Sequence, residues 1–153
     1  MGRLIKNHWA RLITITAASC RLLTDLSDQI VAAFESFFWP KIFWDFLTKS
    51  LDAGIKPVPV LQIINLVLGF VMLAWEWPIG FLAGSSIHRS LEARLAAIPL
   101  FALCALLIYQ GTNAGIYYLV AMVIYFWAYS EGEIICAKPW TLPQRNRGGG
   151  SKA

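Results

Sequence analysis

The segment from residue 59 to residue 77 constrains the fold more than any other part of the chain. It reads PVLQIINLVLGFVMLAWEW, nineteen residues with a single charge, Glu76, near the end. At about 1.5 Å per residue, a helix of this length approaches the ~30 Å thickness of the hydrocarbon layer of a membrane. Trp75 and Trp77 stand where aromatic residues anchor such a helix among lipid headgroups. We therefore expect this segment to cross a membrane.

Composition places the whole chain in the membrane class. Hydrophobic residues make up 58% and charged residues 14%, whereas about 25% of the residues in a soluble domain are charged. The formal charge is +4, and most basic residues lie toward the ends, which favours contact with anionic lipid headgroups. No basic segment carries the interleaved aromatic residues of a single-strand nucleic-acid platform. The expected partners are the lipid bilayer and a second copy or another membrane protein, and not nucleic acid.

Two further apolar segments, residues 93–109 and 114–130, are predicted to be membrane-spanning helices. Only the four polar residues from Gln110 to Asn113 separate them. Two helices of this length with so short a link must run antiparallel as neighbours. The sequence therefore predicts a helical hairpin with its turn at one membrane face.

The first span, residues 12–39, is split by a polar interruption near residues 20–28. One interpretation is a continuous helix with a polar face. A second is a signal peptide with an apolar core at residues 12–18. In the third, residues 20–28 interrupt an ordinary span, because the flanking apolar stretches together match a membrane thickness. The polar face of the continuous helix would carry Arg21, Asp25, Asp28, Ala32 and Glu35.

A short amphipathic helix is expected between the first two spans, from Pro40 to Gly54. Proline suits the first position of a helix, and glycine suits the residue after its end. Apolar and polar side chains segregate at helical spacing, as in helices that lie in the membrane interface. The apolar side would carry Ile42, Phe43, Phe46, Leu47 and Leu51, and the polar side Lys41, Asp45, Thr48, Lys49 and Asp52.

The distribution of basic residues predicts the orientation of this four-span bundle. Nine of them fall on the side shared by both termini and the loop after residue 77, and three fall on the opposite side. The positive-inside rule then places both termini in the cytoplasm. We expect a four-span membrane domain over residues 1–138 and a disordered, basic cytoplasmic tail over residues 139–153.

Five residues are candidates for helix packing. Gln62 and Asn65 share one stripe of the helix predicted at residues 59–77, and both are expected to face inward because unpaired amides are costly in lipid. Gly69 continues that stripe. Gly111 and Gly115 form a GxxxG pair, which permits close approach of two helices.

Three charged residues are candidates for an interfacial ion pair. Glu76 lies at the cytoplasmic end of its span, where its carboxylate can pair with Arg89 or Arg94. A carboxylate deep in the membrane would instead suggest proton or substrate coupling. The position of Glu76 near the end of the span favours the ion pair.

The sequence carries no pattern typical of a catalytic, cofactor or metal site. His88 and Glu92 are four positions apart, but a metal site needs at least one more ligand. The three cysteines lack paired spacing, and no nucleophile elbow, HExxH motif or phosphate-binding glycine loop occurs. We therefore expect a protein that is not an enzyme and holds no cofactor.

Six phrases of the sequence are long enough to be specific, namely KNHWARL, FFWPKIFWDFLTK, PVLQIINLVLGFVMLAWEWP, HRSLEARL, YQGTNA and YFWAYSEGE. They resemble a family of small four-span membrane proteins of filamentous fungi, a domain of unknown function. The likeness covers nearly all of residues 1–140 and implies an integral membrane protein without an established activity. The segment RLLTDLSDQ departs from that pattern, so an insertion, such as a retained intron fragment, is the favoured account of it. The order of spans and loops is more distantly similar to Golgi tetraspan proteins associated with coated vesicles.

Together these observations predict an all-α integral membrane four-helix bundle with a short interfacial helix between the first two spans. The expected role is that of a structural or trafficking accessory protein of the secretory pathway, in the Golgi or endoplasmic reticulum rather than the plasma membrane. The alternative is a small transporter or channel subunit. It would be favoured by a polar pathway through Gln62, Asn65 and the charged face of the first helix.

Overall fold

A computed structural model describes residues 5–18, 29–43, 56, 58–77, 80 and 82–136. Within these ranges the regular structure is helical, with one isolated antiparallel bridge between Ile42 and Ile108, and the expected all-α class is confirmed. None of the helices in these ranges has both the length and the apolar character needed to cross a membrane. The elements are α1 (Lys6–Ala18), α2 (Gln29–Phe38), α3 (Val60–Glu76), α4 (Ser86–Arg89), α5 (Leu91–Leu107), η2 (Tyr109–Gly111) and α6 (Thr112–Ser130).

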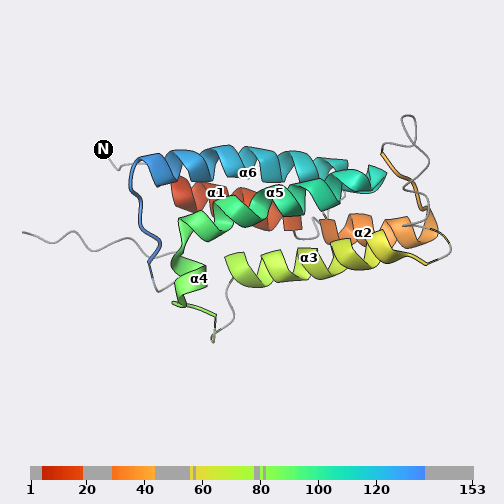
Figure 1. Cartoon of the computed structure of the whole chain (residues 1–153), viewed down its shortest axis with the longest axis horizontal. Coiled ribbons are helices and arrows are strands. Elements are labelled where there is room, and N and C mark those ends of the chain that lie inside the picture. Colours follow the sequence, from red (N-terminus) through yellow and green to blue (C-terminus); the bar gives the residue numbers. More distant parts are fainter. Residues whose placement is uncertain are drawn as a thin grey trace, which may run out of the picture.

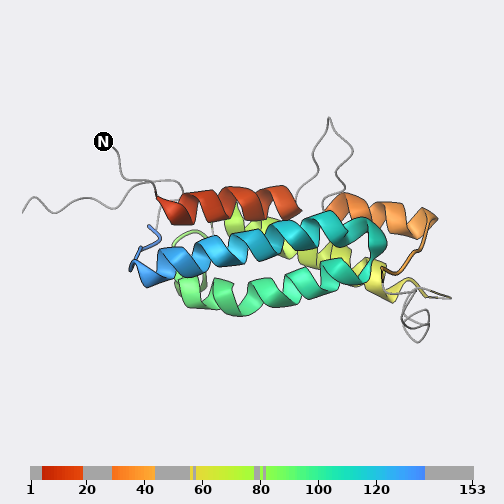
Figure 2. The same ribbon diagram turned by 90° about the horizontal axis from the view of Figure 1, so that it is seen from above.

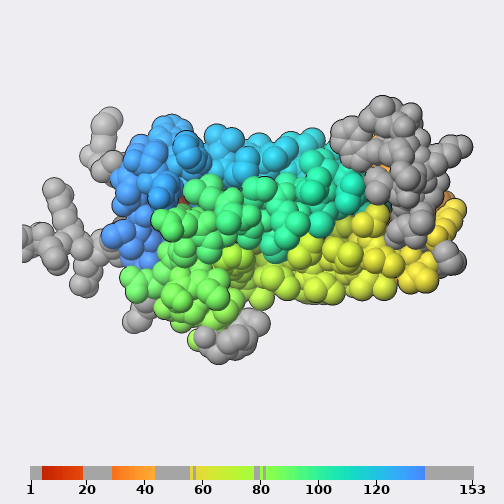
Figure 3. All heavy atoms as spheres, in the orientation of Figure 1, coloured from red at the N-terminus to blue at the C-terminus, as the bar shows by residue number. Residues whose placement is uncertain are grey.

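The long helices run along the length of the molecule (Figures 1 and 2). α5 and α6 form an antiparallel hairpin joined by η2, and α3 lies beside α5. α1 and α2 lie in line, end to end, and together they run alongside the other long helices as one row (Figure 2). α1 packs on α6 and α3, whereas α2 packs on α3 and η2. On the face seen in Figure 3, α3, α5 and α6 are closely packed neighbours.

Helices α3, α5 and α6 lie where the sequence shows unbroken apolar segments. A serine begins α5, because the Ser90 hydroxyl oxygen accepts a hydrogen bond from the backbone N–H of Ala93 at 3.0 Å. Such N-caps satisfy one of the backbone donors that a helix leaves unpaired at its start. The predicted hairpin is thus present as a pair of helices, while their crossing of a membrane stays a prediction.

Glycine allows close packing in two places. A Cβ atom on Gly69 would lie 2.7 Å from the Ile30 side chain on α2. A Cβ atom on Gly115 would lie 2.5 Å from the Leu106 side chain on α5, and one on Gly111 would lie 2.4 Å from the Ala105 carbonyl oxygen. The GxxxG pair therefore serves the contact inside the α5–α6 hairpin.

The beginning of the predicted interfacial helix is not helical. The backbone N–H of Tyr109 donates to the Lys41 carbonyl at 3.0 Å, and that of Phe43 donates to the Leu107 carbonyl at 3.3 Å. These bonds hold residues 41–43 in a bridge against the turn of the hairpin, which excludes a first helical turn at Pro40. Residues 44–55, and likewise the segment 20–28 on which the three interpretations of the first span differ, lie outside the described residues.

Candidate functional site

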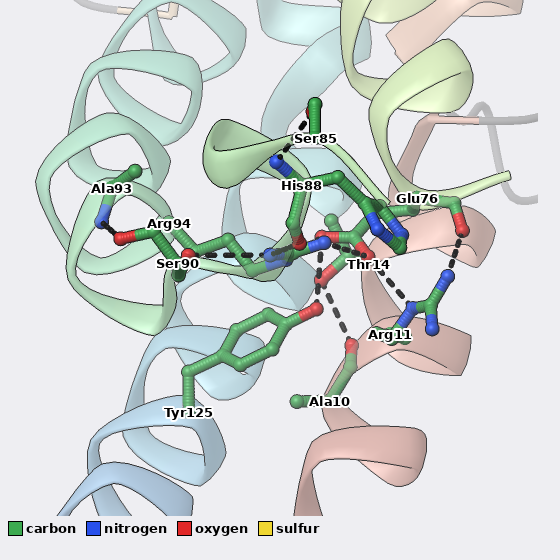
Figure 4. A network of polar contacts seen from close by, with 10 residues as sticks. All are labelled: Ala10, Arg11, Thr14, Glu76, Ser85, His88, Ser90, Ala93, Arg94 and Tyr125. Carbon is green, nitrogen blue, oxygen red and sulfur yellow. Dashed lines mark hydrogen bonds and ion pairs between the residues drawn. The ribbon is translucent and has the colours of Figure 1, made fainter. Parts of the chain in front are cut away.

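The most unusual feature of the interior is a fully buried carboxylate between two buried arginines (Figure 4). Arg94 Nε donates to Glu76 Oε1 at 2.9 Å, and Arg11 Nε donates to Glu76 Oε2 at 3.1 Å. The Tyr125 hydroxyl donates a further hydrogen bond to Glu76 Oε1 at 2.8 Å. Both carboxylate oxygens are therefore satisfied, which is the condition for burying such a charge. We call these four residues the Glu76 cluster.

Four helices supply the Glu76 cluster, one residue each. Glu76 is the last residue of α3, and Arg94 is the fourth residue of α5. Arg11 lies in the middle of α1, and Tyr125 lies five residues before the end of α6. The cluster therefore joins the four helices α1, α3, α5 and α6 at the end of the molecule where α3 ends and α5 begins.

Arg94 is held on its other side by the short helix α4. Its Nη1 atom donates to the carbonyl oxygens of His88 and Ser90. The guanidinium carbon lies 5.6 Å from the Trp75 ring centre and 5.8 Å from that of Tyr125, within range of cation–π attraction. The α4 segment thus positions Arg94 for its ion pair.

The Glu76 cluster carries net positive charge, because two guanidinium groups face one carboxylate. His88 adds no further charge near neutral pH. Burial first, and then the nearby cations Arg94 and Arg11, lower the pKa of His88 to about 4, with Glu76 opposing them. His88 Nδ1 accepts from the Gly84 backbone N–H at 3.4 Å, so the proton of the neutral ring lies on Nε2, which has no hydrogen-bond partner within the described ranges.

A second polar network crosses the middle of the bundle. Gln29 Nε2 donates to Asn65 Oδ1 at 3.1 Å, and Gln29 Oε1 accepts from the Tyr118 hydroxyl at 2.6 Å. Asn65 Nδ2 also donates to the Cys104 carbonyl at 2.9 Å. Gln62 contributes less, since its Nε2 reaches the Ser36 carbonyl at only 3.4 Å and its buried Oε1 finds no partner among the described residues.

Two acidic residues close the same end of the molecule as the Glu76 cluster. The Glu133 carboxylate accepts the backbone N–H groups of Lys6 and Asn7 at 3.0 and 2.9 Å, which ties the chain after α6 to the start of α1. A carboxylate at a helix N-terminus is also favoured by the helix dipole. The Lys6 ammonium pairs with Glu131 and lies 4.0 Å from the Trp127 ring centre.

Of the three residues predicted to form an ion pair, two are in contact and the third, Arg89, is not. Glu76 and Arg94 are in contact and fully buried, whereas Arg89 is exposed and lies away from Glu76 beside a surface cavity. Arg11 was not predicted to join the ion pair, because its place near the N-terminus puts it among the basic residues of the flank. The signal for its burial is the helical spacing of the polar residues Asn7, Arg11 and Thr14 on one face of α1.

The predicted packing residues are all in contact with neighbouring segments. Gln62 and Asn65 share the buried stripe of α3 with Gly69, Met72 and Glu76, and both amides reach other helices. Among the described residues, no group of three His, Cys, Asp or Glu side chains is placed to hold a metal ion. The contacts of the Glu76 cluster join helices, and they suit a structural role.

Comparison with known protein families gives a match over most of the chain. The sequence profile of a family described as a domain of unknown function, DUF7727, matches residues 1–133. The match spans every described helix. No curated protein and no solved structure matches the chain.

Proposed function

The chain belongs to the DUF7727 family, and we propose that it is an integral membrane protein that serves as a structural or trafficking accessory of the secretory pathway. In this proposal the helical bundle lies in a membrane with both termini in the cytoplasm. The protein has no catalytic role and binds no cofactor. The observation that carries the proposal is the inverted polarity of the helices.

Helix α3 has its polar side chains inside and large apolar side chains outside. The buried stripe holds Gln62, Asn65 and Glu76. The outer face presents large apolar side chains such as Val67 and Phe70, which are 54% and 52% exposed. A helix on a water-soluble protein has the opposite arrangement, whereas this one suits a lipid environment.

The same inversion continues around the bundle. α6 exposes Val123 and Phe126, at 62% and 63%, while it buries the hydroxyl-bearing Tyr118 and Tyr125. Further exposed apolar residues lie on α1, α2, α3 and α5. Large apolar side chains exposed on this many helices favour a membrane or protein contact. The exposed large apolar residues of these four helices include Trp9, Leu12, Phe34, Phe38, Ile63, Ile64, Val71, Leu100 and Leu103.

The length of the helices sets a condition on the proposal. α3 has 17 residues, which is about 26 Å at 1.5 Å per residue, a few ångströms less than an average hydrocarbon layer. A bilayer that thins locally, or flanking side chains that reach the interface, accommodates such a mismatch. The apolar outer surface of the whole bundle, rather than one helix alone, is therefore what would contact the lipid.

An accessory role is favoured over transport by the filled interior. Met72, Ile98, Phe101 and Tyr118 are buried together in one apolar core. The alternative, a small transporter or channel subunit, draws on the polar networks, because buried ionisable groups in membranes often mark ion pathways. In the described residues, however, both buried arginines form hydrogen bonds with the Glu76 carboxylate, so these charged groups are paired with one another.

Extraction from membranes tests the placement in lipid. The full chain, tagged at its C-terminus and expressed at native level, should stay with membranes at alkaline pH and be released only by detergent. A peripheral membrane protein in the same sample is the control and should be released. Release of the tagged chain at alkaline pH would contradict the proposal.

Localisation then separates the accessory role from transport. With organelle markers, the tagged chain should appear in Golgi or endoplasmic reticulum structures. A continuous plasma-membrane or vacuolar rim would overturn the secretory-pathway role and favour the transporter alternative, which flux measurements would then test.

A further inference from the structure

The geometry points to a binding pocket for a phosphoethanolamine lipid headgroup between the start of α5 and the end of α6. This inference rests on the proposed placement of the bundle in a membrane. It adds a ligand that neither the family description nor the predicted accessory role contains.

The pocket is an open hollow of about 470 Å³ at the surface, and its volume is sufficient for a lipid headgroup whose acyl chains remain outside. The junction of α4 and α5 forms one wall, and the end of α6 with the following segment forms the other. These two segments meet at the left end of the molecule in Figure 3. The lining residues used below are Arg89, Leu91, Glu92, Tyr129, Glu133 and Ile134.

The cavity offers charge of both signs. Arg89 supplies a guanidinium group that forms no ion pair or hydrogen bond within the described part of the chain, and guanidinium groups bind phosphate oxygens well. Glu92 and Glu133 supply carboxylates. The Tyr129 hydroxyl donates to Glu92 Oε1 at 3.2 Å and fixes that carboxylate, while the backbone of α1 fixes Glu133.

An arginine and two carboxylates in the lining of one hollow suit a ligand that carries both a phosphate and a primary ammonium. The phosphate would pair with Arg89, and the ammonium would donate to the carboxylates of Glu92 and Glu133 beside the Tyr129 ring. A quaternary ammonium cannot donate those hydrogen bonds, and a glycerol headgroup has no charge to offer them. The chemistry therefore favours phosphatidylethanolamine over phosphatidylcholine and phosphatidylglycerol.

The position of the cavity favours a lipid as the source of this headgroup. It lies at the end of the bundle where α5 begins and α6 ends, and the charged residues Lys6, Glu131 and Arg89 lie at this same end. Leu91 and the exposed Ile134 provide apolar lining between the charged groups and the apolar outer surface. A headgroup bound there leaves its acyl chains free to lie along the outside of α5 and α6.

Native mass spectrometry of the purified, delipidated full chain in detergent tests the inference. Short-chain phosphatidylethanolamine should bind about tenfold more tightly than diacylglycerol of the same chain length, since only the former fills the charged pocket. Arg89→Gln should remove that advantage. Glu92→Gln should weaken phosphatidylethanolamine binding and leave phosphatidylglycerol binding unchanged.

Matched variants at other sites control for charge. Lys41→Gln removes a cation at the opposite end of the bundle, and Glu35→Gln removes an exposed carboxylate on α2, so both should bind the lipid as the unmodified chain does. Equal binding by Arg89→Gln and Lys41→Gln chains would overturn the inference. If free phosphoethanolamine binds as tightly as the lipid, the ligand of the pocket is a soluble molecule, and the inference of a lipid ligand is wrong. Membrane extraction tests the proposed function independently, because a chain that remains in membranes can still fail to prefer phosphatidylethanolamine.

Discussion

Arg11 and Glu76 lie 65 positions apart in the sequence and meet through two hydrogen bonds in the buried interior. Arg11 Nε donates to the Glu76 carboxylate at 3.1 Å, and Arg11 Nη2 donates to the Glu76 backbone carbonyl at 2.6 Å. Because Glu76 is the last residue of α3, its carbonyl is one of those that a helix leaves unpaired at its end. Arg11 therefore neutralises a buried charge and caps α3 with the same side chain.

Removal of the Glu76 charge should be the most damaging single change in the cluster. Glu76→Gln leaves Arg11 and Arg94 buried without a counter-ion, and the expected loss in the free energy of unfolding is about 3–5 kcal/mol. Arg11→Met leaves a neutral pair of Glu76 and Arg94, so its expected loss is smaller, roughly 1–3 kcal/mol. Denaturant unfolding of the full chain in detergent measures both, with the exposed Glu35→Gln as control. An equal loss for the two variants would show that net charge does not govern this cluster.

Alanine substitutions at two glycines of the hairpin and at Gly80 should differ in their cost in stability, according to what the new Cβ atom meets. Gly111→Ala directs the methyl group at a backbone carbonyl, so it should cost about 1–3 kcal/mol of stability. Gly115→Ala meets the Leu106 side chain, which can move, so its cost should be lower. Gly80→Ala has open space around it and should be close to neutral. Thermal unfolding of the three variants gives the order, and a Gly80→Ala chain as unstable as Gly111→Ala would contradict it.

The two amides of α3 should differ in their contribution to stability. Asn65→Leu removes the hydrogen bonds of Asn65 with the Gln29 Nε2 donor and the Cys104 carbonyl, at an expected cost of about 1–3 kcal/mol. Gln62→Leu removes one long hydrogen bond and also removes an unsatisfied buried oxygen, so it should change stability by less than about 1 kcal/mol. Unfolding in detergent compares them directly. A larger loss for Gln62→Leu than for Asn65→Leu would refute this assignment.

His88 should make the fold less stable in mild acid. Its pKa is about 4 in the folded chain and about 6.5 when unfolded, so the unfolded state binds more protons between these values. The free energy of unfolding should therefore fall as pH is lowered from 6.5 toward 5, and it should be flat with respect to this group above 7. The His88→Gln chain lacks the titrating group and should lose this part of the pH dependence. An NMR titration that places the folded pKa near 6.5 would rule the prediction out.

The in-line arrangement of α1 and α2 predicts which deletion the fold tolerates. In a continuous helix without residues 21–28, Gln29, Ala33 and Ser36 would follow the buried Ala18 at three, seven and ten positions and extend its buried stripe. The variant that lacks residues 21–28 should therefore have about the same free energy of unfolding as the full chain.

Removal of one more residue provides the control for that deletion. A chain without residues 20–28 would turn α2 by about 100° relative to α1. The hydrogen bonds of Gln29 with Asn65 and Tyr118 would then be lost, at roughly 1–3 kcal/mol. Equal unfolding free energies for the two deletions would exclude a continuous first row.

The all-α class, the positions of α3, α5 and α6 and the inward stripe of α3 follow from the amino-acid sequence alone, because helix formation and the spacing of polar residues are local properties. The packing of the helices is needed to see that Glu76 pairs with Arg11 and Arg94 rather than Arg89, and that residues 41–43 form a bridge instead of a helical turn. Those contacts join residues far apart in the chain, and they depend on how each helix is rotated and shifted against its neighbours. A single sequence does not specify that rotation, since several cations lie close enough in sequence or on the same predicted side to reach one carboxylate.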